Sequence, residues 1–379
     1  MTSVPMKVLA LTSYPIEAAA TRYRLAQFVD PLAERGITLT IRPFLDTALF
    51  QGLYDKRKIA RTTLALLTST VRRVEDLFTA RAMDVILVQR EAMILGPPWV
   101  EWMLAKAFSC PMVLDLDDAT YLSYTSPTYG RAAKTLKWFR KTDDLIRWSK
   151  LVTCGNRAIA DYVTGKGAIA RIIPTVVDTD LFAPLDRSSN TKLPVLGWIG
   201  THSTFPYLQS IFPVLQDLAQ KYPFRLKVVG AGELDIKIPG VEIENLKWKL
   251  EREVSDFQSI DIGLYPIDAT LYSDHWAAAK SGFKAIQYMA VGIPYVASPV
   301  GAAGEIGVVG NTHFLAQSPD EWHNALGCLI SDVPKRLKMG AAGRNHAITH
   351  YTVPAQADKL AEALLAAMEV ERTYAKNAS

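Results

Sequence analysis

Apolar runs alternate with amphipathic stretches along the whole chain. Short apolar runs bounded by Gly or Pro indicate buried strands, and apolar residues three or four apart indicate helices. In the first half this predicts strands at 6–12, 37–43, 84–88, 111–115, 151–153 and 170–173, and helices at 21–35, 55–81, 97–108, 131–149 and 156–164. In the second half it predicts strands at 194–199, 225–229, 241–243, 260–264, 294–297 and 312–315, and helices at 204–221, 251–257, 281–291, 319–331, 334–348 and 354–371. The alternation predicts α/β domains with mostly parallel sheets.

A polar segment from Ala183 to Pro194 interrupts the alternation. It has a proline near each end and no periodicity, which is typical of an interdomain linker. We therefore expect two doubly wound Rossmann-like domains, at 1–185 and 186–353, facing a central cleft. Residues 354–379 are predicted to form a helix that packs back toward the first domain. Ligands of such sheets bind beyond the carboxyl ends of the strands, so the cleft is the expected site.

Composition indicates the class of the protein and its expected cellular compartment. The 379 residues are 49% hydrophobic, which suits two globular domains rather than a disordered chain. Three scattered cysteines, Cys110, Cys154 and Cys328, argue for reduced thiols in the cytoplasm and against a disulfide framework or zinc cluster. The first apolar run is too short for a signal sequence, and no uncharged apolar stretch is long enough to span a membrane. Residues 1–190 hold 25 Lys and Arg against 19 Asp and Glu, whereas the remainder holds 17 against 19. This asymmetry suits an anionic partner of the first domain, or simply an uneven solvated surface.

The segment from Lys280 to Gly301 is the most informative stretch of the chain. Ser281 is a suitable N-cap for a helix from Gly282 to Ala290. The free N–H groups at the start of that helix, with Lys280 and Lys284 beside them, would form a seat for a diphosphate. The alternative is that the two lysines belong to an ordinary solvated surface.

This string resembles the donor-binding segment of the family 4 retaining glycosyltransferases, also called glycosyltransferase group 1. Other pieces similar to that family follow in its order: Ile173 to Asp178 with Phe182 and Pro184, Leu196 to Gly200, Asp261 to Pro266, Ala342 to His346, and Tyr351. The resemblance covers nearly the whole chain. It implies a GT-B fold, with an acceptor-side first domain and a nucleotide-sugar-binding second domain. It also implies a nucleotide diphosphate sugar donor, UDP- or GDP-linked, and transfer with retention of anomeric configuration, without a metal or other cofactor.

The chain departs from the family pattern at two places. Members commonly carry two Glu around the donor helix, where this sequence has Ala279 and Gln287. An amide oxygen can still accept a hydrogen bond from a ribose hydroxyl, but more weakly than a carboxylate. Many members also place Arg and Lys after the first strand of the second domain, where this loop reads Gly200-Thr201-His202. Lys280 and Lys284 are expected to supply the missing positive charge.

Three acidic residues follow the strand at 111–115 and would lie at its carboxyl end. Asp115, Asp117 and Asp118 are close enough in sequence to hold a divalent cation. Alternatively, Asp117 or Asp118 bonds the acceptor hydroxyl as a general base, or Asp118 caps the following turn. The resemblance implies no metal, so we assign Asp117 and Asp118 to catalysis.

The remaining candidates come from loops at the same strand ends. Thr21 is expected to cap the first helix, and Arg24 to hold an acceptor phosphate or the leaving diphosphate; a plain surface arginine is the alternative. The resemblance places Glu305 at the ribose or sugar and Trp248 and Tyr265 near the base. Their alternatives are helix capping for Glu305 and plain burial for the aromatic pair. The full set expected to bind substrate is Gly200, Thr201, His202, Trp248, Tyr265, Lys280, Ser281, Gly282, Phe283, Gln287 and Glu305, and the catalytic set is Asp117, Asp118, Arg24 and Lys284.

The expected activity is hexosyl transfer from a nucleotide sugar to a hydroxyl of a saccharide or lipid-linked acceptor, in polysaccharide or glycolipid assembly. Two alternatives remain open. One is a GT-B-like sugar-nucleotide epimerase, and the other is a non-catalytic binding subunit, which the changed Glu pair favours. No nucleic-acid partner is expected.

Basic and aromatic residues also predict a contact with the inner face of a membrane. Residues 131–150 hold seven Lys or Arg and two Trp, and a second basic run lies at 56–61, followed by Arg72 and Arg73. Cations beside aromatic and apolar side chains on a helix suit an anionic lipid surface. The cations to be tested are Lys137, Arg140 and Lys141. The alternative is that Trp138 and Trp148 face the core.

Overall fold

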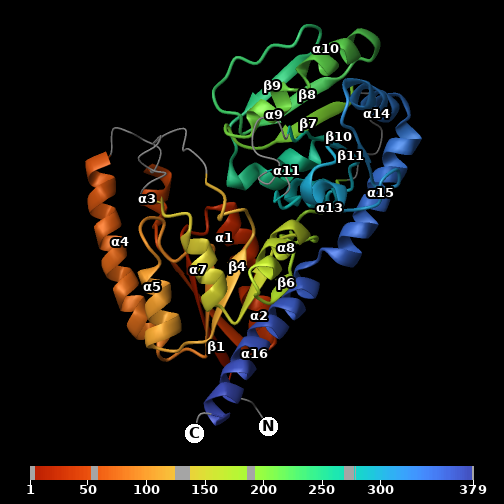
Figure 1. Cartoon of the computed structure of the whole chain (residues 1–379). Helices are drawn as coiled ribbons and strands as arrows, with labels where there is room; N and C mark the ends of the chain where they lie inside the picture. Colours follow the sequence, from red (N-terminus) through yellow and green to blue (C-terminus); the bar gives the residue numbers. More distant parts are fainter. Residues whose placement is uncertain are drawn as a thin grey trace. The chain divides into compact units, whose positions relative to one another are not determined.

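The computed structural model describes residues 5–52, 59–123, 137–185, 193–268, 277 and 279–377. The chain divides into two compact units, each built on its own sheet (Figure 1). The first unit comprises residues 1–175 together with 353–379, and the second comprises 176–352. The α/β class and the two doubly wound sheets predicted from the sequence are thus confirmed.

The first sheet is wholly parallel, in the order β2-β1-β3-β4-β5-β6. Its strands are β1 Met6–Thr12, β2 Ile37–Pro43, β3 Val85–Gln89, β4 Met112–Leu116, β5 Leu151–Cys154 and β6 Ala170–Ile172. The interior strands β3, β4 and β5 are buried throughout, as expected of a parallel sheet covered on both faces. The strand order reverses between β1 and β3, and ligands of such sheets bind at this switch point.

Helices cover the first sheet on both faces (Figure 1). They are α1 Ala19–Arg24, α2 Val29–Glu34, α3 Thr47–Gly52, α4 Ile59–Ala80, α5 Trp99–Trp102, α7 Lys141–Trp148, α8 Arg157–Gly165 and α16 Val353–Asn377, with a 3₁₀ turn at Ala26–Phe28 and a π turn at Met103–Ala107. The C-terminal helix α16 packs on α2 and on strands β3 to β5. An ion pair from Arg35 to Asp358, with Nε 2.6 Å from Oδ1, fastens it there.

The second sheet is also parallel, in the order β12-β11-β10-β7-β8-β9. Its strands are β7 Val195–Ile199, β8 Arg225–Val229, β9 Glu242–Leu246, β10 Ile262–Tyr265, β11 Tyr295–Ala297 and β12 His313–Leu315. Its helices are α9 Phe205–Gln209, α10 Phe212–Lys221, α11 Glu253–Gln258, α13 Phe283–Ala290, α14 Pro319–Ser331 and α15 Val333–His350, with 3₁₀ turns at Leu250–Arg252 and Gly301–Gly304. The order reverses between β7 and β10, which defines the switch point of this unit.

The boundary between the units lies about ten residues earlier than the predicted division after residue 185. Residues 176–184 join the second unit because its helices hold them. The guanidinium of Arg344 donates to the carbonyls of Thr179 and Phe182, at 2.8 and 3.0 Å. The Phe182 ring is buried and meets the ring of Phe257 edge to face, at 6.0 Å between centroids.

Two long helices predicted from periodicity are broken in the structure, each beside a proline. The stretch predicted at 204–221 divides into α9 and α10, with Pro213 in the first turn of α10. The stretch at 21–35 divides into α1, a 3₁₀ turn and α2, with Pro31 inside α2. Proline lacks an N–H, and its ring clashes with the carbonyl four residues earlier, so the helix is interrupted before each proline and restarts with the proline in its first turn.

The described helices include none that is both long and apolar enough to cross a membrane.

Candidate active site

The predicted donor residues of the second unit gather at the carboxyl edge of its sheet. Gly200 follows β7 and Tyr265 ends β10, so these two lie on either side of the switch point. Thr201 and His202 continue the loop after β7 and are exposed, and Trp248 follows the neighbouring edge strand β9. A single sheet edge therefore brings together residues that are up to 65 positions apart in the sequence.

Two glycines allow the loops at this edge to touch. Gly230, after β8, has a φ of +88°, and a Cβ there would lie 2.2 Å from the carbonyl oxygen of Gly200. The same Cβ would come within 3.7 Å of the Cβ of Trp248. Only glycine fits both the left-handed conformation and the short distance. Gly230 thus holds the Gly200 loop and Trp248 close to each other.

Helix α13 begins one residue later than predicted. Its N-cap is Gly282, with a φ of +66°, and Ser281 precedes the cap, so the predicted capping role of Ser281 is wrong. A Cβ on Gly282 would lie 2.2 Å from Cδ1 of Ile306 and 3.1 Å from Cβ of Ala302. The helix start therefore packs directly on the segment after β11. Glu305 is exposed in that segment and follows a 3₁₀ turn, so it does not cap a helix's first turn.

Lys284 lies in the first turn of α13 and is held there by two contacts. Its Nζ donates to Oε1 of Gln287 at 2.9 Å and lies 5.2 Å from the centroid of the Phe257 ring. Gln287 is fully buried, and this does not fit its predicted hydrogen bond to a ribose hydroxyl. Its amide instead orients the Lys284 ammonium without neutralising the charge, which a carboxylate would do. The neighbours Lys280, Ser281 and Phe283 are half-buried around the same helix start.

In the first unit, Asp117 is clamped by an arginine that the sequence reasoning missed. Arg90 follows β3, with a φ of +61°, and its Nε and Nη2 donate to the two carboxylate oxygens of Asp117 at 2.5 and 2.7 Å. Burial alone would raise the pKa of Asp117, but the charge and hydrogen bonds of Arg90 outweigh it, so the pKa lies below its usual value. Asp117 is therefore ionised and is a weak base. The available signal was a polar Gln-Arg-Glu run, at 89–91, directly after a buried strand.

Arg24 is a buried structural residue and not the surface phosphate ligand that was predicted. Its side chain is 2% exposed, and it makes a two-pronged ion pair with Asp115, with Nε 3.0 Å from Oδ2 and the second bond from Nη2 to Oδ1. Nη1 donates to the carbonyl of Ile173. Thr21, expected to cap α1, lies inside the helix and its hydroxyl bonds the carbonyl of Tyr14 at 2.8 Å. Both residues fasten α1 to the sheet.

The three carboxylates at the carboxyl end of β4 do not converge. Asp115 bonds Arg24, Asp117 bonds Arg90, and Asp118 accepts a hydrogen bond from the backbone N–H of Ala119 at 2.9 Å. Over the ranges that the structure describes, no three His, Cys, Asp or Glu side chains are grouped to hold a metal ion. Asp118 is the more accessible of the two predicted catalytic carboxylates, since it is half-buried while Asp117 is buried.

Part of the predicted membrane surface is internal. Lys141 is buried, with Nζ 2.7 Å from Oε2 of Glu91, and Arg73 is 1% exposed. Leu145 and Ile146, two apolar residues of the 131–150 segment, belong to the core. Of the two tryptophans, Trp138 is 51% exposed and Trp148 is half-buried. Of the two remaining cations, Lys137 is half-buried and Arg140 is exposed. Residues 131–136 and 56–58 of the two basic runs lie outside the described residues.

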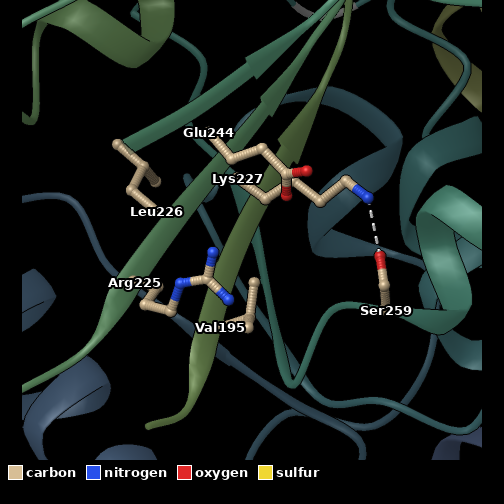
Figure 2. Close-up of a pocket in the computed structure, with 6 residues that line it drawn as sticks. All are labelled: Val195, Arg225, Leu226, Lys227, Glu244 and Ser259. Atoms are coloured by element: carbon tan, nitrogen blue, oxygen red, sulfur yellow. Dashed lines mark hydrogen bonds between the residues drawn. The ribbon is translucent and has the colours of Figure 1, made fainter. Parts of the chain in front are cut away.

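A small pocket of the second unit lies away from these residues. Val195 and Arg225, the first residues of β7 and β8, line it with Leu226, Lys227, Glu244 and Ser259 (Figure 2). Nζ of Lys227 bonds the Ser259 hydroxyl at 2.8 Å and the Asp256 carboxylate at 2.9 Å. The pocket therefore sits toward the amino ends of the strands, opposite the edge where ligands of such sheets bind.

Two parallel doubly wound units with polar residues at the carboxyl edges of their strands define the class of two-domain GT-B enzymes. The family model described as Glycosyl transferases group 1 matches residues 194–332. This part of the chain is thus similar to that family of glycosyltransferases, in agreement with the resemblance, and the chain as a whole has the GT-B fold.

Solved structures of the same fold cover nearly the whole chain. HepE from Anabaena, in complex with UDP-glucose, is 18% identical with a TM-score of 0.66, over 95% of this chain and 99% of that one. Sucrose-phosphate synthase from Thermosynechococcus elongatus is 14% identical with a TM-score of 0.66, over 96% and 100%. A glycosyltransferase from Rickettsia africae is 13% identical with a TM-score of 0.71, over 97% and 99%. No curated protein matches the chain at a significant level.

Proposed function

We propose that this glycosyltransferase moves a sugar from a nucleotide diphosphate donor, UDP- or GDP-linked, to a hydroxyl acceptor with retention of anomeric configuration. The observation that carries the proposal is the arrangement at the carboxyl edge of the second sheet. Helix α13 follows β10, which pairs with β7 at the switch point, and Lys280 and Lys284 flank the start of this helix. The HepE structure, which has the same fold, holds UDP-glucose, and this supports a nucleotide-sugar donor.

The proposed roles follow from charge and position. The N–H groups at the start of α13, with Ser281, Lys280 and Lys284, stabilise the negative charge that develops on the leaving diphosphate. Tyr265 and Trp248 contact the base, and Gly200, Thr201, His202 and Glu305 line the same edge. The leaving phosphate helps to deprotonate the acceptor hydroxyl on the face from which it departs. That geometry gives retention without a protein nucleophile.

In the first unit, Asp117 and Asp118 are proposed to bind the acceptor. Arg90 keeps Asp117 ionised, so this carboxylate accepts hydrogen bonds from sugar hydroxyls rather than taking up a proton. Asp118, the more accessible carboxylate, lies next to it and is the better candidate to contact the reacting hydroxyl. Asp117 and Asp118 thus position the acceptor by hydrogen bonds, while the proton of the reacting hydroxyl passes to the leaving phosphate.

The donor is identified first by binding and then by transfer. A thermal-shift screen with nucleotides and nucleotide sugars identifies the base, because a ligand at a hundred times its dissociation constant stabilises the fold by about 2.7 kcal/mol. Transfer from the stabilising donor to a panel of saccharide and lipid-linked acceptors is followed by NMR of the new anomeric proton. An inverted product would exclude the retaining mechanism. Conversion of the donor into its epimer without an acceptor would favour the epimerase.

A non-catalytic binding subunit is the second candidate, and one specific observation favours it. The two positions where the family commonly has Glu are Ala279 and Gln287, and both are fully buried. Such a subunit would bind the nucleotide in the thermal-shift screen, but would neither transfer the sugar nor slowly hydrolyse the donor.

Replacing Lys284 by Ala should weaken the binding of UDP or GDP by about 1.5–3 kcal/mol, the contribution of a hydrogen bond to a charged group. This corresponds to roughly a 10–150-fold higher dissociation constant in titration calorimetry. The matched control is Lys335→Ala, because Lys335 also lies over a phenylalanine ring, 5.3 Å from Phe314, in the same unit. Equal affinities in the two variants would remove the phosphate-seat assignment.

Turnover should be unchanged in excess EDTA, because helix N–H groups and lysines are proposed to balance the diphosphate charge. Initial rates are compared before and after dialysis against the chelator. Activity that disappears and returns with magnesium or manganese would place a metal at the diphosphate and overturn the proposed charge balance.

We further propose that the reaction belongs to cell-surface polysaccharide or glycolipid assembly in the cytoplasm, at the inner face of the membrane. The net positive charge of the first unit supports this location. Residues 1–175 and 353–379 hold 27 Lys and Arg against 20 Asp and Glu, while residues 176–352 hold 15 against 18.

A further inference from the structure

Helix α4 exposes the apolar side chains that a surface helix normally buries. Leu67, Val71, Val74 and Phe78 are 61, 61, 39 and 65% exposed. Their spacing of four, three and four residues places them in one straight line along the helix. We call these four residues the α4 stripe. At 1.5 Å per residue it is about 17 Å long.

The opposite face of α4 is partly polar and is anchored in the first unit. Arg73 donates to the carbonyls of Arg42 and Thr12 at 3.1 and 3.0 Å, and to the carboxylate of Asp76 at 2.8 Å. Ser69, one turn earlier, is 1% exposed. Rotating the helix to bury the α4 stripe would break the bonds of Arg73 to the Arg42 and Thr12 carbonyls and expose Leu77, which is 6% exposed. The outward position of the stripe is therefore fixed by the internal bonds of the unit.

We infer that the α4 stripe is the surface through which the protein docks on an anionic lipid membrane. A helix that lies in the membrane interface buries a straight apolar face and keeps cations at its flanks. Arg72 lies on α4, is 49% exposed and pairs with Asp46, with Nη2 3.2 Å from Oδ2. Arg81 directly follows α4, and its guanidinium lies 4.3 Å from the centroid of the Phe108 ring. Glu75 is the exposed acidic residue on this part of the helix. The net positive charge of the first unit complements an anionic surface.

The size of the α4 stripe argues against a second copy of the chain as its partner. A fully covered aromatic side chain buries about 150–250 Å². Only Phe78 is aromatic, and even at that aromatic value the four side chains, which are 39–65% exposed, would supply less than the ~800 Å² that each partner of a stable complex usually buries. A membrane has no such minimum area, because each inserted side chain adds to the binding.

The anchoring of α4 also relates the stripe to the proposed acceptor residues. Thr12 ends β1, and Arg73 bonds its carbonyl at the carboxyl edge of the first sheet. The Thr12 hydroxyl donates to Oε1 of Gln89 at 2.7 Å, and Gln89 precedes Arg90, the partner of Asp117. Hydrogen bonds would thus connect a membrane-bound α4 stripe to the carboxyl edge of the first sheet, which is proposed to bind the acceptor. This inference rests on the proposed function and deepens it, because it names the membrane as the source of a lipid-linked acceptor.

The test is flotation of the full-length protein with vesicles, in the absence of donor and acceptor. Vesicles of phosphatidylcholine with 30–40% phosphatidylglycerol, roughly the anionic fraction that gives a strong surface potential, are compared with pure phosphatidylcholine at low and high salt. The double variant Leu67→Gln, Phe78→Gln should reduce the bound fraction on anionic vesicles at least tenfold. The matched control is Leu337→Gln, Ile348→Gln, an exposed pair on α15 with the same spacing of eleven residues, and it should bind like the native protein.

Each other outcome overturns the inference. If the native protein does not float with anionic vesicles, or if the α4 variant floats as well as the control, the stripe is not a lipid-binding surface. If the native protein sediments as a dimer and the α4 variant as a monomer, a second copy covers the stripe. Unfolding midpoints show whether both variants keep their fold. Because no substrate is present, the result does not depend on whether the protein transfers sugar.

Discussion

Replacing Arg24 by Leu should lower the free energy of unfolding of the first unit by about 3–5 kcal/mol, the usual effect of breaking one side of a buried ion pair. Asp115 would remain as a buried carboxylate, bonded to the Thr153 hydroxyl at 2.6 Å but with no cation beside it. The Ile173 carbonyl would lose its donor as well. The change is measured by denaturant titration, with hydrogen exchange in β1 and β4 to assign it to the first unit.

Two controls separate a structural from a catalytic role. Arg35→Leu removes an ion pair to Asp358 that is largely exposed on the carboxylate side, and should cost at most about 1 kcal/mol. The double variant Arg24→Leu, Asp115→Leu should recover part of the lost stability, because no charge is then left buried. An Arg24→Leu protein with native stability but no turnover would restore the phosphate-binding role.

Replacing Gly282 by Ala should destabilise the second unit by about 2–5 kcal/mol and weaken nucleotide binding with it. The new Cβ must adopt a left-handed conformation, which costs about 1–2 kcal/mol. It would also lie 2.2 Å from Ile306, and such overpacking adds about 1–3 kcal/mol. The backbone at the start of α13 must then shift, and the proposed diphosphate donors move with it. Unfolding and calorimetric titration of the same preparation report both effects.

Gly304→Ala is the matched control for this variant. Gly304 lies in the 3₁₀ turn that packs beside Gly282, and a Cβ there would have nothing within 4 Å. The Gly304→Ala variant should have the same free energy of unfolding and the same nucleotide affinity as the native protein. Adding Ile306→Ala to Gly282→Ala should remove the collision but not the cost of the left-handed backbone. If Gly282→Ala alone binds nucleotide with native affinity, the start of α13 does not hold the donor.

Much of the fold could be predicted because the parallel strands are buried on both faces. Runs such as Val85 to Val88 are apolar without alternation, so their position follows directly from the residues. The breaks were harder to place. Apolar periodicity continues across Pro213 and Pro31, and only the missing N–H of proline interrupts the helix there. The unit boundary was misplaced because Phe182 and the carbonyls bound by Arg344 make contacts far away in the sequence.

The site could be predicted only in part, because some of its contacts join residues that are far apart in the sequence. The motif around Gly282 and Lys284 is local, and the structure shows a helix starting at this motif after β10. Partners across a sheet are not local. Arg90 and Asp117 follow adjacent strands but are 27 residues apart, and no sequence period relates them. A cation and a carboxylate that pair inside the fold look like exposed, reactive residues in the sequence, as Arg24 and Lys141 did.

The outer strands of both sheets bear on how the chain avoids self-association while it folds. β6 and β12 contain three residues each, β2 ends at Pro43, and β9 carries Glu242 and Glu244. Short length, proline and charge each make an open strand edge a poor template for a neighbouring chain. Parallel sheets join strands that are distant in sequence and therefore form slowly, leaving such edges uncovered for longer. The protection at the four edges thus matters most before the native state is reached.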